Sequence, residues 1–184
     1  MQPFISLTIL PADRTQHLLW RLTEGGEIPP SLNPDVVVLL IGTNNLPRLS
    51  DRQGLLPVLD GLLEIIKVLR NALPNTVILL NDIFPRSDAT PLVSALVSDL
   101  NHMLSRWHRD KVTRLPLEQK FIKLLHCGDL FLSHVGGPSM VVNTTLMPDS
   151  LHPSAAGIQL WLSECILPVA VQVIGKKQGD AKSE

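Results

Sequence analysis

Three runs of consecutive apolar residues divide the chain, at 36–41, 76–80 and 121–126. At least half of the residues in the first two runs are β-branched, whereas Lys123 and His126 weaken the third run. Neighbouring residues of a strand point to opposite faces, so runs that are apolar at every position are typical of strands buried on both faces. The pattern therefore predicts three strands of a parallel sheet.

Apolar residues at helical spacing fill the segments between these runs, and we interpret them as core-facing stripes. The predicted helices cover 13–22, 55–69, 93–107 and 154–165. Asp13 and Gln16 resemble a capping box that opens the first helix, and Pro168 is expected to end or kink the last. Strands that alternate with helices predict an α/β fold, specifically a three-layer αβα sandwich.

Polar residues follow the first two predicted strands directly, as Gly42-Thr43-Asn44-Asn45 and as Asn81-Asp82. In a parallel sheet the carboxyl ends of neighbouring strands share one edge, and ligands bind beyond that edge. The segment 127–147 has little pattern, which is typical of a functional or mobile connection. Asp149 and His152 come directly after it.

The chemistry of acyl transfer suits these residues. An Asp three positions before a His can orient the imidazole as a general base, and Asn44 in a Gly-containing turn can donate to an oxyanion. Each signal alone has another interpretation. Asp149 can be a helix-capping carboxylate beside a surface histidine, and Gly42 with Asn44 can be an ordinary turn.

Composition narrows the classes of function. The chain has 184 residues, a net charge of −1 and a sequence pI near 6.6, which favours one domain over 1–175 and no nucleic-acid partner. We expect a disordered tail at 176–184, no transmembrane segment, no metal and no cofactor. Cys127 and Cys165 have neither metal-site spacing nor the pattern of a disulfide framework, so we expect reduced thiols and a cytoplasmic protein.

Three stretches together resemble a known family. Asp13-Arg14-Thr15-Gln16-His17-Leu18-Leu19-Trp20-Arg21-Leu22, Gly42-Thr43-Asn44-Asn45 and Leu151-His152 are similar to the SGNH (GDSL-type) hydrolases, closest to the catalytic α subunits of platelet-activating factor acetylhydrolase IB. The resemblance implies a flavodoxin-like sheet and an esterase that removes a short acyl group from a phospholipid-like or other small ester. It assigns His152 as general base, Asp149 as its orienting carboxylate and Asn44 as oxyanion donor. It also implies homodimers or heterodimers and a WD-repeat regulatory partner.

The sequence departs from the family pattern at two places. Ala12 occupies the position of a glycine whose N–H joins the oxyanion hole, and a positive φ there would cost an alanine about 1 kcal/mol or more. The second departure concerns the nucleophile, which the family carries in a Gly-Asp-Ser motif. Ser6 lies in an apolar run, and Cys127-Gly128-Asp129-Leu130 imitates the motif with a leucine in the serine's place. We therefore assign no nucleophile.

Without that serine, the chain is expected to be inactive or nearly so, because the nucleophile is worth a factor of about 10⁶ in subtilisin. The sheet is expected to lack its first strand, so that either two central edges stay unpaired or residues 7–10 pair directly with 36–41. A shortened gene product, an alternative isoform or an incomplete gene model is then favoured over a purpose-built pseudoenzyme. Two other functions stay open: a non-catalytic homologue that dimerises or binds a WD-repeat partner, and an unrelated nucleotide-binding protein.

Overall fold

The computed structural model describes residues 5–6, 12–88, 90–112, 121–134 and 140–180. Its centre is a parallel sheet of four strands in the order β1-β2-β3-β4. The strands are β1 (Ile5–Ser6), β2 (Val36–Leu39), β3 (Val77–Asn81) and β4 (Ile122–Leu125). The three apolar runs thus form strands, as their pattern predicted.

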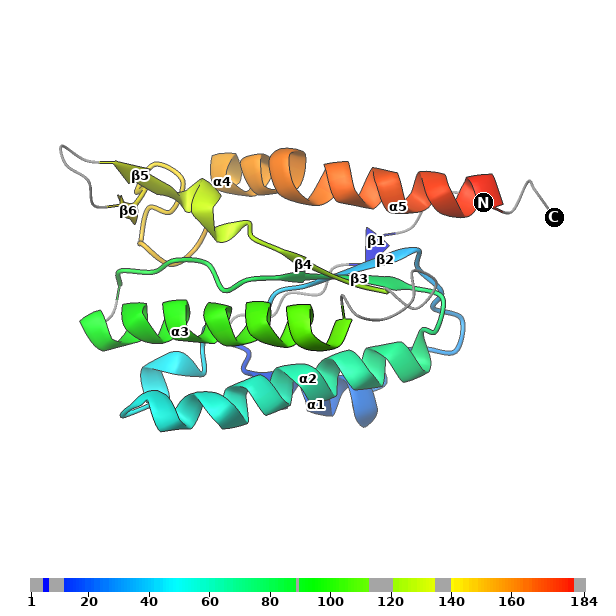
Figure 1. Cartoon of the computed structure of the whole chain (residues 1–184), viewed down its shortest axis with the longest axis horizontal. Coiled ribbons are helices and arrows are strands. Elements are labelled where there is room, and N and C mark those ends of the chain that lie inside the picture. The colour runs from blue at the N-terminus through cyan, green and yellow to red at the C-terminus, as the bar shows by residue number, and fades with distance from the viewer. Residues whose placement is uncertain (1–4, 7–11, 89, 113–120, 135–139, 181–184) are drawn as a thin grey trace.

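Helices cover both faces of the sheet (Figure 1), and this confirms the three-layer αβα sandwich. One face carries α1 (Thr15–Thr23), α2 (Leu55–Ala72) and α3 (Pro91–Trp107), and the other carries α4 (Ala155–Leu160) and α5 (Leu167–Asp180). The side chains of β3 alternate between the two cores: Ile78 and Leu80 pack with the first set of helices, and Val77 and Leu79 with the second. All of β3 is buried, as expected for a central strand.

The pairing of β2 decides between the two expectations for the sheet. One side of β2 pairs with β3 over its whole length, and the other side pairs with β1, Ile5 opposite Val36 and Ser6 opposite Val37. The N-terminal segment therefore pairs directly with β2, but through Ile5–Ser6. Residues 7–10, for which this pairing was expected, lie outside the described part of the chain.

Two details of the helix prediction were wrong. Helix α1 begins at Thr15 with Arg14 as its N-cap, because Asp13 forms an ion pair with Arg21 at 2.5 Å instead of capping. Of the two outcomes expected at Pro168, an end of the last helix was wrong, whereas a kink stays a prediction. The π-helical turn η6 (Trp161–Ile166) precedes it, and α5 continues to Asp180. A wide π turn changes the hydrogen-bond register, and Pro168 falls in the first turn after it, where a missing N–H is best tolerated. Residues 176–180 of the expected tail are thus helical.

The helical segment Ala155–Lys176 is long and apolar enough to cross a membrane by length and composition, a test that the core helix of a soluble protein also passes, so the expectation of no transmembrane segment stays a prediction. Only 28% of its most apolar stretch is buried within the protein. Four of its side chains nevertheless form part of the second core: Trp161, Ile166, Ala170 and Val173. Packing against the sheet therefore accounts for one apolar face of this helix.

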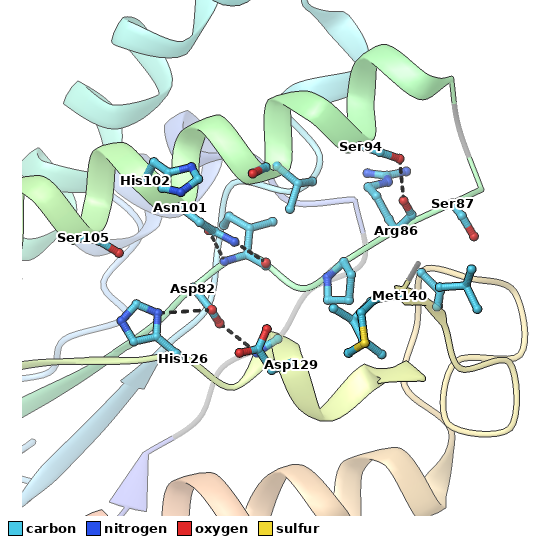
Figure 2. A pocket seen from close by; sticks show the side chains of 18 residues that line it. Asp82, Arg86, Ser87, Ser94, Asn101, His102, Ser105, His126, Asp129 and Met140 are labelled. Carbon is cyan, nitrogen blue, oxygen red and sulfur yellow. Dashed lines mark hydrogen bonds and ion pairs between the residues drawn. The ribbon is translucent and has the colours of Figure 1, made fainter. Parts of the chain in front are cut away.

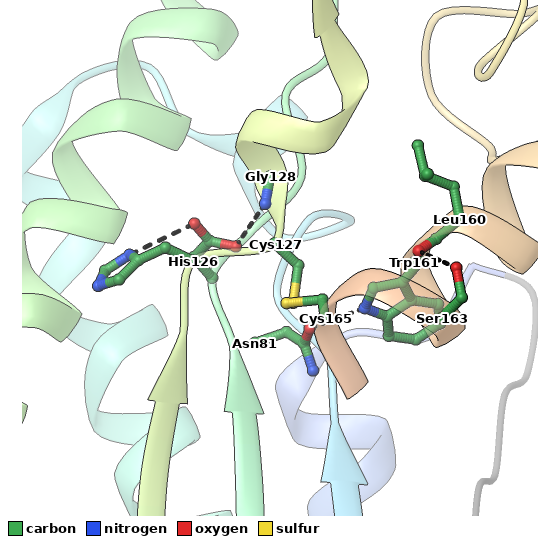
Figure 3. The surroundings of a disulfide bond; sticks show 9 residues. Asn81, His126, Cys127, Gly128, Leu160, Trp161, Ser163 and Cys165 are labelled. Carbon is green, nitrogen blue, oxygen red and sulfur yellow. Dashed lines mark hydrogen bonds and ion pairs between the residues drawn. A yellow bond between two sulfur atoms is a disulfide. The ribbon is translucent and has the colours of Figure 1, made fainter. Parts of the chain in front are cut away.

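The expectation of free thiols was wrong, because Cys127 and Cys165 form a disulfide (Figure 3). Cys127 follows β4 and Cys165 lies in η6, so the two residues meet only because the C-terminal helices pack on the sheet. The two cysteines are 38 residues apart in the sequence, and no sequence pattern indicated that they would meet. The bond closes a loop that includes Asp149 and His152. The cytoplasmic location, which we inferred from reduced thiols, stays a prediction.

Cys165→Ser, or reduction of the disulfide, should lower the free energy of unfolding by about 4 kcal/mol, because a loop of this length would regain its freedom in the unfolded chain. Urea unfolding with and without dithiothreitol measures the effect. The matched control is the double variant Cys127→Ser/Cys165→Ser, whose midpoint should not respond to the reductant. Equal midpoints for the unsubstituted chain under both conditions would contradict the disulfide.

Candidate active site

The turn after β2 requires a glycine. Gly42 has φ +118°, a backbone conformation that side chains strongly disfavour, and a Cβ there would lie 3.4 Å from Ile83 Cδ1. The carbonyl of Gly42 accepts the Asn45 N–H at 3.0 Å, which closes a tight turn. This turn supports the position of Asn44, the role expected for Gly42.

Both asparagines of the turn bind the start of α1. Asn44 donates through Nδ2 to the Asp13 carbonyl at 3.0 Å. Asn45 accepts the Thr15 N–H at 3.1 Å and donates to Thr15 Oγ1 at 3.1 Å. An amide nitrogen carries two hydrogens, and the bond to Asp13 uses one of them. The half-buried Asn44 side chain therefore keeps a second amide hydrogen beyond its bond to Asp13, and its role as an oxyanion donor stays a prediction.

Ala12 adopts a φ of +62° and is exposed. This is the left-handed conformation in which we expected alanine to be strained, by about 1 kcal/mol relative to glycine. The strained turn leads into Asp13, whose carbonyl holds Asn44. Whether the Ala12 N–H serves as the second oxyanion donor stays a prediction.

Asp149 and His152 form the closest carboxylate–imidazole pair among the described residues. Asp149 Oδ2 lies 2.6 Å from His152 Nδ1, and Asp149 Oδ1 accepts the backbone N–H groups of His152 at 2.7 Å and of Leu151 at 3.0 Å. The backbone N–H of His152, then its side chain, then the N–H of Leu151 hold the pKa of Asp149 well below its usual range. The pair is exposed, with 74% of the His152 side chain and 57% of the Asp149 side chain accessible. Nε2, the nitrogen that would accept a proton, lies on the ring edge away from Nδ1.

One connection, between β3 and α3, links the two loops. The buried Arg86 guanidinium donates through Nη1 to the Thr43 carbonyl at 3.0 Å and to Thr43 Oγ1 at 3.2 Å. The next residue, Ser87, donates its N–H to the Ser150 carbonyl at 3.1 Å. Thr43 is adjacent to Asn44, and Ser150 lies between Asp149 and His152. Arg86 was not singled out from the sequence. Its position shortly after a predicted strand, at the edge where ligands bind, is the one feature of the sequence that pointed to it.

Other predicted positions have structural roles. Asn81 is buried and accepts the Trp161 indole N–H at 2.9 Å (Figure 3), so its side chain belongs to the core. The Gly128 N–H donates to Asp82 at 3.0 Å, and Leu130 forms part of the 3₁₀ turn η5 (Gly128–Phe131), which supplies no hydroxyl. Among the described residues no group of three or more His, Cys, Asp and Glu side chains is placed to hold a metal ion.

No nucleophile is evident in the described part of the chain, where no serine is hydrogen-bonded to His152. Ser6 lies opposite Val37, five residues before Gly42, which corresponds to about 15 Å along an extended strand. This register places Ser6 near the amino end of β2, far from the edge that carries the two loops.

Comparison with known proteins places the chain in one family. The family described as GDSL-like lipase/acylhydrolase matches residues 10–160. Over 74 residues, 40% of this chain, the sequence is 38% identical to the platelet-activating factor acetylhydrolase IB subunit beta homolog of Drosophila melanogaster, and this stretch spans 30% of that relative.

Solved structures share the fold. A protein of Bacteroides fragilis assigned as an acylhydrolase has a TM-score of 0.63 at 14% identity, covering 88% of this chain and 71% of its own. A mutant acetyl esterase with a bound acetate ion gives 0.62 at 17% identity, with 90% and 70% covered. A GDSL-like lipase of Bacteroides thetaiotaomicron gives 0.58 at 14% identity, with 94% and 73% covered.

The lowered pKa of Asp149 has a measurable consequence. His152→Ala should raise that pKa but leave it below the ordinary carboxyl value of about 3.9, since the backbone N–H groups remain. Because the folded-state pKa is depressed, the stabilisation from Asp149 is present above about pH 4 and is lost as the pH falls towards the lowered value. NMR titration of the Asp149 carboxyl carbon measures the shift. An ordinary titration in the unsubstituted chain would contradict the pairing.

Proposed function

We propose that this chain, which belongs to the GDSL-like lipase/acylhydrolase family, carries the general base and oxyanion donor of a site that hydrolyses short-acyl esters. The observation that carries the proposal is the pair formed by Asp149 and His152 on a loop that the Arg86–Ser87 segment ties to the Asn44 turn. The hydrogen bonds from Arg86 to Thr43 and from Ser87 to Ser150 support the proposal that Asn44 and His152 lie at the rim of one pocket. We further propose that 1–175 functions as one SGNH-type domain.

In the proposed reaction, His152 Nε2 takes the proton of a nucleophilic hydroxyl while that oxygen attacks the ester carbonyl. The second hydrogen of Asn44 Nδ2 would stabilise the negative oxygen of the tetrahedral intermediate, and the Ala12 N–H is the proposed second donor. Asp149 stabilises the imidazolium by its bond to Nδ1. The imidazolium then returns the proton to the leaving alcohol, and attack by water releases the acid.

The proposed substrate has a short acyl group on a phospholipid-like or other small alcohol. Two relatives support the acyl length: one is named an acetylhydrolase, and one is an acetyl esterase solved with acetate. The aligned stretch of the first relative is short, so its substrate is a proposal for this chain. We propose no cofactor, because general-base catalysis of ester hydrolysis needs none.

We propose that the 184-residue chain turns over slowly by itself, since neither Ser6 nor Leu130 offers a hydroxyl at the site. In subtilisin, loss of the nucleophile lowers kcat by a factor of about 10⁶. The catalysis that remains comes from the oxyanion donor and from substrate binding.

Hydrolysis of p-nitrophenyl acetate tests the proposal. We expect weak turnover by the chain alone and strong turnover by a chain to which a Gly-Asp-Ser strand has been added at the N-terminus. In the extended chain, His152→Ala should abolish the gain, whereas His134→Ala, at an exposed histidine of the strand β5 (Leu132–His134), should not. Fast hydrolysis by the chain alone that survives His152→Ala would refute the assignment.

One observation favours a second candidate, a non-catalytic subunit that binds another copy or a WD-repeat partner. Trp20 on α1 is 60% exposed and Leu56 on α2 is 59% exposed, although both are large apolar side chains. Tryptophan is enriched at protein–protein interfaces relative to the rest of the surface. If the extended chain hydrolyses no ester although it folds, this second candidate becomes the better proposal.

A further inference from the structure

A cavity of about 660 Å³ opens beside the sheet edge, between α3 and the segment that follows β4 (Figure 2). Its volume lies within the usual range for small-molecule sites, about 300–1,000 Å³. The antiparallel pair of β5 and β6 (Met140–Val142) forms a further wall. Asn44, Asp149 and His152 are not among the described residues that line it, although Arg86 and Ser87, which connect the two loops of the proposed esterase site, do line it.

Asp82 is the most unusual group in the cavity lining. The residue is only 7% exposed, yet it carries an ionisable carboxyl. Its Oδ1 accepts the Gly128 N–H at 3.0 Å, and its Oδ2 lies 3.6 Å from His126 Nδ1. Burial, and to a smaller extent the charge of Asp129, raises the pKa of Asp82. A buried carboxylate without a full positive partner is costly, so a cation in the cavity would relieve this cost.

Among the described lining residues, the nearest cationic group to Asp82 that an ion pair records is the His126 imidazole, and no lysine or arginine is paired with it. Arg86 is the one lysine or arginine among the described lining residues, and its guanidinium binds Asp88 at 2.6 and 2.8 Å as well as Thr43. His126 carries a full charge only when it is protonated. Asp129 adds a second carboxylate to the lining. The described lining residues therefore offer Asp82 no lysine or arginine as a partner, and they place a second carboxylate near it.

The lining also indicates which kind of cation fits. The described residues offer no grouping for a metal ion, so an organic cation is favoured. Apart from imidazoles, no aromatic ring lines the described cavity, and quaternary ammonium groups are usually held by aromatic faces. The hydroxyls of Ser98 and Ser105 and the two carboxylates accept hydrogen bonds, which suits N–H donors. Leu132 and Val142 offer apolar contact for a short carbon chain.

We propose that this cavity is a second binding site, which takes the primary ammonium group of a small amphipathic amine with Asp82 as its anchor. Asp129 lies near enough to share the positive charge, and the wall of β5 and β6 packs against the carbon chain. The site goes beyond the proposed esterase function and does not depend on it.

Isothermal titration with n-butylammonium, n-butanol and n-butyrate tests the site, because the three probes share a carbon chain and differ in charge. Only n-butylammonium should bind, and Asp82→Asn should weaken its binding at least about tenfold, since charged hydrogen bonds are worth about 1.5–3 kcal/mol. Asn keeps an acceptor for the Gly128 N–H, so the fold should survive. Asp60→Asn, at an exposed carboxylate of α2, is the matched control and should leave the affinity unchanged.

NMR of the unsubstituted chain locates the probe independently of any variant. n-Butylammonium should shift the resonances of His126 and Val142 and leave those of His152 unchanged. Equal binding of n-butanol would overturn the proposal. So would an unchanged affinity in Asp82→Asn, or shifts confined to His152.

Discussion

The arrangement of the site depends on one buried cation. Arg86 is almost inaccessible to water, and its guanidinium is held on two sides: by Asp88 through two short hydrogen bonds, and by the carbonyl and hydroxyl of Thr43. A buried guanidinium tolerates few geometries, because each unpaired N–H would be costly. The neighbouring Ser87 binds Ser150. A single rigid connection therefore sets the relation between the turn that carries Asn44 and the loop that carries His152.

The other constraints act on each loop separately. Gly42 and the two asparagines fix the first turn against α1, while the disulfide from Cys127 to Cys165 closes the segment that carries His152. The Asp149 carboxylate, which accepts two backbone N–H groups as well as the imidazole, orders the last few residues. The side chains that we propose for hydrolysis are thus held in place by the fold around them, although no nucleophile lies beside them in the described chain.

The sequence was sufficient for features that depend on local periodicity. Apolar runs predicted the strands β2, β3 and β4, and helical spacing predicted the helices, because burial on one or two faces leaves a repeat in the sequence. Features that depend on distant contacts were not predictable in this way. The bond between Cys127 and Cys165 and the role of Arg86 arise only when segments far apart in the sequence meet. Helix α1 starts after Arg14 because Asp13 pairs with Arg21 and does not cap the helix. The last helix continues past Pro168 because a π turn precedes the proline. Neither effect can be read from the helix propensities of the residues.

Side-chain NMR of an Arg86→Lys variant tests the central claim most directly, since a lysine keeps the charge but loses the planar set of donors. Arg52→Lys, which alters an exposed ion pair with Asp99, is the matched control. If the connection through Arg86 and Ser87 couples the two loops, Arg86→Lys shifts both the Asn44 side-chain amide and the His152 imidazole, and the control shifts neither. A change at Asn44 with none at His152 would show that the loops are positioned independently, and would contradict the account.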